Sequence, residues 1–491
     1  MALLDTSIVN AALPVIQGEI GATTSEGTWL GTSYLVAEIV IMPLTAWFER
    51  LFGLRRVLLT GSVIFTFFSV VCGFSTDLTT MIIGRVGQGI SGGVMIPTGM
   101  TILAKRLPAS QQSVGMAIFA AAALLGPIVG PVLGGWITEN ASWHYAFFIN
   151  VPICAVLVAL ILVAVTPDKP ENGAKAEADW WGVVGMMVGL GALTVLLEEG
   201  HREQWFESSL IWKLAIAAAT GFALVAVGQK LSRTPVLKLS LLRDRGLSSV
   251  LFLMSVTGVV LFSTLFTVPQ FLALIAGYNA FQAGIVLTTA GAVSIIGAML
   301  YPIVVARVDV RLIVATAFCF TGSGSFLASR LTAESAGWHF VPGLILMGIG
   351  TTFSAIPLQQ GALSCVEVED SAESTSMFNI ARNLGGSIGL AVLASLLDVR
   401  LEFHHWRLHE TIGANDPSTW ERLSGMSAQF GGGPEGLDAA YRSLDAQIML
   451  EALVMSFEDV FVTLSLASFL SLPLVLLLKQ IDPERAQGMA H

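Results

Sequence analysis

Long apolar segments recur along the whole chain and are separated by short polar stretches. Many of these segments approach or exceed the roughly 18 residues that mark a membrane-spanning helix. The alternation of polar and apolar residues in segments of about 10, typical of a membrane β-barrel, is not found. The pattern therefore predicts an all-α polytopic membrane protein. We expect fourteen transmembrane helices, over residues 1–17, 29–48, 57–74, 78–104, 111–138, 144–165, 179–198, 208–229, 247–273, 280–304, 312–330, 338–363, 374–399 and 457–478.

Composition supports this prediction. Hydrophobic residues make up 54% of the chain and charged residues only 12%, whereas soluble proteins carry about 25% charged residues. The net charge of −10 comes mostly from loops, and no basic stripe suggests a nucleic-acid partner. The four cysteines lie in or beside apolar segments, where packing is the simplest role. No cluster of catalytic groups suggests an enzyme, and no cofactor is expected.

The distribution of Lys and Arg predicts the orientation in the membrane. Sixteen of the 25 basic residues fall in one set of alternate connections and seven in the other, four of them in a single long loop. Cytoplasmic loops are the ones enriched in Lys and Arg. We therefore expect both termini in the cytoplasm. The first predicted span is short, and we favour a start upstream of Met1.

Two connections break the regular rhythm of the spans. Residues 166–178 are polar and rich in Pro and Ala, which predicts a cytoplasmic linker. Residues 400–456 form the only long external loop, and it contains stretches that could be helical.

Four ionisable residues fall inside predicted spans: Asp5, Glu38, Arg85 and Arg382. A charge at the bilayer centre costs at least about 2.5–3.5 kcal/mol, so such residues are functional candidates. From the helical rise, Glu38 and Arg85 lie about 13 and 12 Å from the external ends of their spans. Glu38 and Arg85 are therefore at matching depth and could pair, with Asp5 about one turn deeper.

A buried carboxyl beside an arginine can exchange a proton near neutral pH, because burial favours its neutral form and the arginine its charged form. That property suits proton coupling or substrate binding, which we favour for Asp5 and Glu38. The alternative is a structural ion pair that holds helices together. For Arg382 the two roles remain equally plausible.

Residues 126–137 read GPIVGPVLGGWI, with Gly126, Gly130 and Gly134 four residues apart on one helical face. Such a face is common where two membrane helices pack closely. The prolines within the same stretch predict a helix that is both closely packed and bendable, as a gating element would be. Other candidate substrate-contacting residues, chosen from their helical positions, are Tyr34, Glu38, Gln88, Gln270, Phe353, Gln359 and Arg382.

These stretches together resemble the major facilitator superfamily, and within it the fourteen-span drug:proton antiporters of the EmrB/QacA type. LDTSIVNAALP resembles the first-span signature of that group and contains Asp5, and RVGQGISGG resembles the fourth-span motif, with Arg85 as the arginine linked to proton transfer. WHYAFFINVPI and SMFNIARNLGGSIG are also similar to the group. The most specific match is to the antiporter pattern GxxxGPxxGG, at Gly126, Gly130, Pro131, Gly134 and Gly135.

The resemblance implies a major facilitator fold: two six-helix bundles with two additional spans between them, and alternating access by rocking of the bundles. Its expected parts are an N-terminal bundle over 1–165, the linker and two extra helices over 166–246, and a C-terminal bundle over 247–491 that includes the long periplasmic loop 400–456. The loop between the second and third spans departs from the family pattern, because Arg50 stands where the family has Asp.

The function implied is proton-coupled export of hydrophobic toxic compounds from the bacterial cytoplasmic (inner) membrane. The long loop resembles the EmrB branch, whose members work with a periplasmic EmrA-like adaptor and an outer-membrane channel. A dedicated exporter of one metabolite or siderophore is the alternative, and a non-transporting membrane sensor is a weaker one. His405 and His409 are four residues apart within that loop, but without an HExxH arrangement a metal site is not favoured over adaptor contact or an extended thirteenth helix.

Overall fold

The structure is a computed structural model that describes residues 1–167, 179–232, 235–411 and 417–478. These residues are almost entirely helical and contain no strand, which confirms the predicted fold class. Each of the fourteen predicted spans overlaps a helix. Ten helices of the described chain are long and apolar enough to cross a membrane. For the helices at 2–20, 24–41, 78–106 and 109–140, the crossing stays a prediction.

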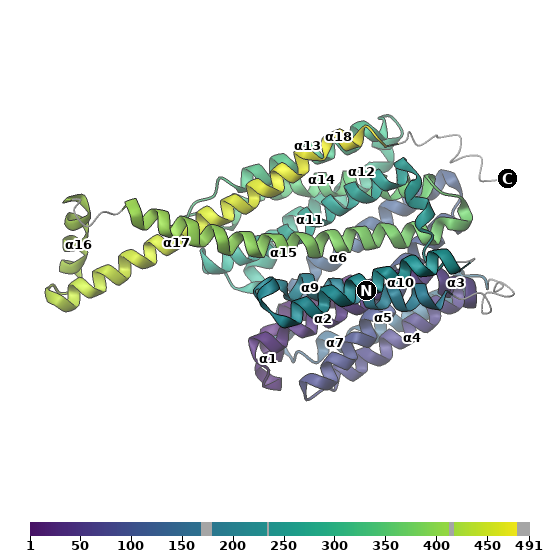
Figure 1. The fold of residues 1–491 in the computed structure, drawn as a ribbon, viewed down its shortest axis with the longest axis horizontal. Coiled ribbons are helices and arrows are strands. Elements are labelled where there is room, and N and C mark those ends of the chain that lie inside the picture. Colours follow the sequence, from purple (N-terminus) through teal and green to yellow (C-terminus); the bar gives the residue numbers. More distant parts are fainter. Residues whose placement is uncertain (168–178, 233–234, 412–416, 479–491) are drawn as a thin grey trace.

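The first half of the chain forms one group of helices (Figure 1). Within it α1 packs on α6, α2 on α5, and α4 on both α5 and α8. Gly53, at φ 83°, ends α3 and starts α4, a backbone conformation that favours glycine. The elements are α1 (Ala2–Ile20), α2 (Thr24–Ile41), η1 (Met42–Leu44), α3 (Thr45–Phe52), α4 (Leu54–Gly73), α5 (Leu78–Arg106), α6 (Ala109–Asn140), α7 (Tyr145–Phe148) and α8 (Asn150–Ala164).

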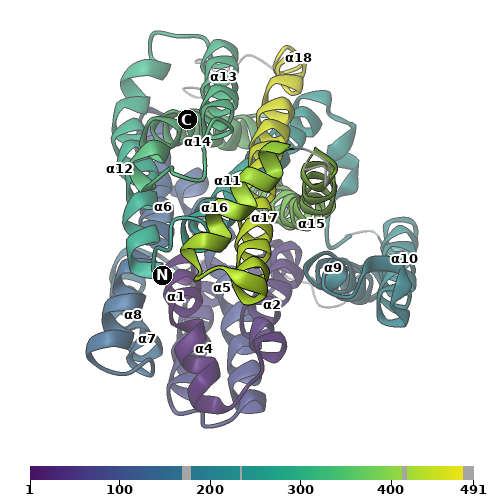
Figure 2. The ribbon, with the colours of Figure 1, turned by 90° about the vertical axis from the view of Figure 1, so that its left-hand side faces the viewer.

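Two helices follow the linker and lie beside the main body, as Figure 2 shows. They are α9 (Trp180–Gly200) and α10 (Ser209–Leu231), joined through η2 (Trp205–Glu207). Glycines on both helices let the two backbones approach closely, since a Cβ on Gly221 would lie 2.2 Å from the Gly189 nitrogen. The pair is held to the rest of the molecule by α9, which packs on α2 and α15.

The second group contains the remaining helices. Within it α11 packs on α15, α13 on α14 and α17, and α12 on α14. Its elements are η3 (Leu239–Arg243), α11 (Arg245–Leu274), α12 (Ala280–Val305), α13 (Val310–Ala328), α14 (Gly337–Ser364), η4 (Val368–Asp370), α15 (Ser371–Thr411), α16 (Pro417–Gln429), α17 (Gly433–Leu470) and α18 (Leu472–Val475).

The two groups meet mainly where α6 packs on α12 and α5 on α15. Several polar contacts cross this boundary. Arg50 lies 3.7 Å from the Glu373 carboxylate, and the Asn379 amide lies 3.2 Å from the Met100 sulfur. Arg50, the residue that departs from the family pattern, therefore contacts the second group of helices.

The segment expected as a long loop is helical over most of its described length. α15 continues to Thr411 and α17 begins at Gly433, so the two helices project together from the body and carry α16 near their end (Figure 1). A small apolar core of Leu423, Ala440, Leu444 and Ile448, with Leu408 packed against it, joins α15, α16 and α17. The helical stretches expected within this connection are present, and the extended thirteenth helix is confirmed. We call residues 400–456 the hairpin.

Candidate functional site

A buried polar cluster surrounds Asp5 in the first group of helices. The Arg85 Nη1 atom lies 2.6 Å from Asp5 Oδ2, and neither side chain is exposed. The other carboxylate oxygen, Oδ1, accepts hydrogen bonds from Gln88 Nε2 at 3.1 Å and from Asn150 Nδ2 at 2.5 Å. Both carboxylate oxygens are therefore satisfied, as a buried charge requires.

Arg85 is held in place by contacts from two other directions. Its Nε donates to the Leu30 carbonyl at 2.9 Å, and its Nη1 also donates to Gln88 Oε1 at 3.0 Å. The guanidinium lies 4.3 Å from the centroid of the Tyr34 ring, within cation–π distance. The arginine thus connects α1, α2 and α5 through one charged group.

Two members of the cluster were missed by the sequence analysis. Asn150 opens α8, and Ser69 on α4 accepts a hydrogen bond from Gln88 Nε2 at 2.8 Å. Both are fully buried. A polar residue in the middle of the apolar stretch FFINVPI was the available signal for Asn150, but nothing in the spacing related it to a carboxylate 145 positions away.

Arg85 forms its ion pair with Asp5 and not with Glu38, the pairing that the depth estimate had allowed. The depth estimate placed the start of the second span at residue 29, whereas α2 begins at Thr24. Glu38 therefore lies about 7 Å farther from that end of the helix than estimated. Glu38 interacts electrostatically with Arg382 on α15 of the second group and with Arg85 on α5 of the first.

The glycine face of α6 packs directly on the backbone around Asp5. A Cβ on Gly126 would lie 2.8 Å from the Leu4 nitrogen, and one on Gly130 would lie 2.3 Å from Ser7 Cβ. A Cβ on Gly134 would lie 2.7 Å from the Ile8 carbonyl oxygen. Gly135 faces elsewhere, with Phe281 of α12 as its nearest neighbour at 3.8 Å. Three glycines of the motif therefore pack against α1, and the fourth, Gly135, lies at the boundary with the second group.

Glycines on α5 play the same part for α2. A Cβ on Gly89 would lie 2.4 Å from the Tyr34 carbonyl oxygen, and one on Gly93 would lie 2.5 Å from that of Glu38. This close approach brings Tyr34 over the guanidinium of Arg85. The fourth-span motif therefore supplies both Arg85 and the space that its partners need.

The predicted substrate-contacting residues do not all meet at one place. Gln88 and Tyr34 belong to the buried cluster, and Phe353 packs near Tyr301 where α6, α12 and α14 meet. Gln270 and Gln359 are far apart. Helices α11 and α14 run antiparallel, with Thr257 bonded to Ser354, and in that register the two glutamines are about 18 residues apart, or about 27 Å.

Gln270 and Gln359 do share one property. Gln270 Oε1 and Gln359 Nε2 are buried, and neither has a hydrogen-bond partner among the described residues. An unpaired buried polar atom costs about 1–3 kcal/mol, so each is a candidate to bind a polar group of a ligand. By the register of α11 and α14, they would contact a ligand at different levels along these two helices.

These features define a helical membrane transporter, with a buried ion pair in one bundle and glycine faces on which neighbouring helices pack closely. The chain belongs to the Major Facilitator Superfamily, whose family pattern matches residues 1–390. It is 29% identical over 469 residues to the multidrug export protein EmrB of Escherichia coli K12, covering 94% of this chain and 89% of the relative. It is 30% identical to EmrB of Haemophilus influenzae, with 97% and 92% covered.

A solved structure supports the fold independently. The human organic anion transporter MFSD10 superposes with a TM-score of 0.62 at 15% sequence identity, covering 96% of both chains. At that identity the likeness concerns the arrangement of helices alone.

Proposed function

We propose that this protein is a proton-coupled antiporter that exports hydrophobic drugs and other toxic compounds across the bacterial cytoplasmic membrane. The observation that carries the proposal is the ion pair of Asp5 and Arg85, fully buried and seated against the glycine face of α6. The names of the EmrB relatives support the export of multiple drugs. A dedicated exporter of one metabolite or siderophore remains the alternative.

In this mechanism Asp5 exchanges the proton. Protonation removes the negative charge that holds Arg85, so α1 loses its electrostatic link to α5 and can shift along the α6 glycines. Glu38 on α2 and Arg382 on α15 interact electrostatically, so a movement of one group of helices relative to the other would change that interaction. Substrate entering from the cytoplasm or inner leaflet favours the deprotonated state. It does so only through its different affinities for the two states.

The proposed orientation places both termini in the cytoplasm and the hairpin in the periplasm, following the bias of basic residues. In that position the hairpin suits contact with a periplasmic adaptor of the EmrA type, and through it an outer-membrane channel. Trp406, Trp420 and Tyr441 are exposed on the hairpin and offer aromatic contacts to such a partner.

The proposal is tested with dye transport in everted membrane vesicles. Wild type is compared with Asp5→Asn and Glu38→Gln, and Asp77→Asn serves as the control carboxylate, since it lies at the start of α5 outside the cluster. We expect gradient-dependent transport that Asp5→Asn abolishes and Asp77→Asn retains. Normal transport in both Asp5→Asn and Glu38→Gln would refute the assignment. A drug-susceptibility panel separates a multidrug exporter from a dedicated one.

A further inference from the structure

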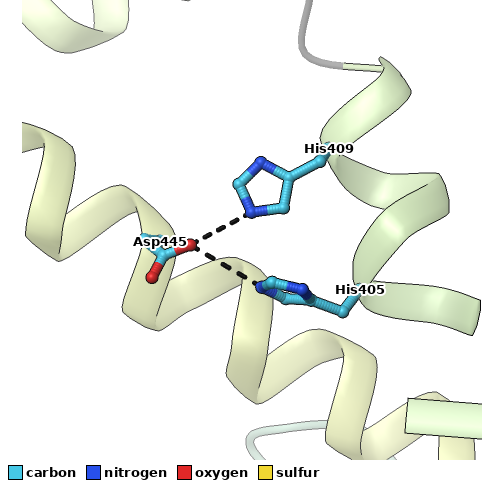
Figure 3. A group of neighbouring side chains, drawn as sticks. All are labelled: His405, His409 and Asp445. Atoms are coloured by element: carbon cyan, nitrogen blue, oxygen red, sulfur yellow. Dashed lines mark hydrogen bonds and ion pairs between the residues drawn. The ribbon is translucent and has the colours of Figure 1, made fainter. Parts of the chain in front are cut away.

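Three metal-ligating side chains converge on the hairpin, far from the buried cluster. His405 and His409 lie one turn apart on α15, and Asp445 faces them from α17 (Figure 3). The Nε2 atoms of His409 and His405 lie 3.0 and 3.6 Å from Asp445 Oδ1. All three ligand atoms lie within 4.8 Å of one another. The sequence spacing relates only the two histidines, and Asp445 joins them only in the folded structure.

These spacings suit a small divalent cation. Zinc binds imidazole nitrogen and carboxylate oxygen at about 2.0–2.2 Å, so neighbouring ligands of a tetrahedral site are about 3.4 Å apart. The two distances to Asp445 fall on either side of that value. Two histidines and one carboxylate leave a fourth position open to water or another ligand. Glu402 lines the same groove as both histidines.

Comparison with other histidine–aspartate contacts separates this cluster from an ordinary ion pair. Among the ion pairs of the described residues, Asp398 is contacted by a single histidine, His201. His404 contacts Asp459, whose charge is also balanced by Arg400 at 2.5 Å. At Asp445 two imidazoles point to one carboxylate oxygen, and no Lys or Arg forms an ion pair with it in the described part of the chain. A bound cation would supply the missing positive charge.

The cluster is also accessible. The side chains of His405, His409 and Asp445 are 34%, 46% and 61% exposed, so a cation can enter from solution. The ligands come from two helices, and Leu444 beside Asp445 belongs to the apolar core of the hairpin tip. A cation held here would therefore link α15 to α17 next to that core.

We propose that His405, His409 and Asp445 form a binding site for a divalent transition metal of the zinc type, which cross-links the two long helices of the hairpin. The cation fixes the angle at which α16 and the hairpin tip are presented. This role is separate from proton coupling, since the cluster and Asp5 lie in different parts of the molecule. Metal occupancy would instead control what the hairpin can bind.

The test is zinc titration of the purified full-length protein in detergent, carrying an affinity tag without histidines and stripped with a chelator. Isothermal titration is expected to give one equivalent of saturable Zn²⁺ binding. Loss of groups outside the ligand shell weakens metal binding by about 10–100-fold, so His409→Gln and Asp445→Asn should weaken it by at least about tenfold. Co²⁺ provides a second readout, through a visible absorption band that both variants lose.

The controls are matched in exposure and residue type. Asp438→Asn removes a carboxylate of α17 that is 63% exposed, and His201→Gln removes a histidine that is 34% exposed. Both should bind Zn²⁺ as wild type does. In wild type, Zn²⁺ should also slow hydrogen exchange in α16 and α17. Absence of saturable binding, or equal weakening in the control variants, overturns the proposal.

Discussion

Substituting Gly130 by alanine tests whether the α6 glycine face sets the position of Asp5. The new Cβ would lie 2.3 Å from Ser7 Cβ, at least 1.1 Å closer than ordinary van der Waals contact at 3.4 Å. Because Ser7 Cβ is fixed to the backbone, no rotamer change relieves the overlap, and α1 itself must move. Asp5 lies two residues away on α1, where it holds contacts of 2.5 to 3.1 Å. A shift of this size would break them.

The expected cost to stability is modest compared with the cost to function. Overpacking of this kind lowers the free energy of unfolding by about 1–3 kcal/mol. Replacing a helical glycine by alanine raises it by about 0.5–1 kcal/mol. We therefore expect Gly130→Ala to fold with a slightly lowered melting temperature and to lose gradient-driven dye transport in everted vesicles. Loss of transport without loss of the folded protein is the distinguishing result.

Gly135→Ala is the control within the same motif. Its Cβ would lie 3.8 Å from the nearest atom, Phe281 Cβ, so no helix has to move. This variant should keep wild-type transport and gain up to about 1 kcal/mol of stability. If Gly130→Ala transports normally while Gly135→Ala fails, the glycine face does not act through Asp5.

Three further predictions follow from other contacts. Asn150→Leu removes a hydrogen bond to the Asp5 carboxylate, so it should cost about 1.5–3 kcal/mol in denaturation experiments and impair transport. Glu38→Gln and Arg382→Gln should be non-additive in a double-mutant cycle of transport rates, because the two charges interact. Asp77 caps α5, and a backbone hydrogen bond there lowers the pKa of its carboxyl. Wild type should melt at a higher temperature than Asp77→Ala at pH values above the usual aspartate pKa. This difference should disappear as the pH falls through the lowered pKa of Asp77.

The sequence indicated much of the fold and the centre of the site, since both depend on local patterns. Apolar segments of spanning length located every long helix of the body. Asp5 and Arg85 stood out because charge is rare in such segments. The four-residue spacing of Gly126, Gly130 and Gly134 indicated a close-packed face, and only its partner, α1, had to come from the structure.

The remaining features depend on contacts between distant segments. Asn150 reaches Asp5 only because α8 packs beside α4, and no local spacing reveals that contact. The hairpin lacks the apolar spans that mark the body helices, so the sequence indicated that parts of it could be helical but not how its helices pack together. Asp445 joins His405 and His409 only once α15 and α17 lie side by side.

The measurement that tests proton exchange at Asp5 most directly is substrate-induced proton release from the purified protein. The protein in weakly buffered detergent solution is mixed with a transported dye, and a pH indicator reports the protons released. Wild type and Asp77→Asn should release protons on dye addition, whereas Asp5→Asn should bind dye without release. Release from Asp5→Asn equal to that of wild type would contradict proton exchange at Asp5 and place the exchanging carboxyl elsewhere.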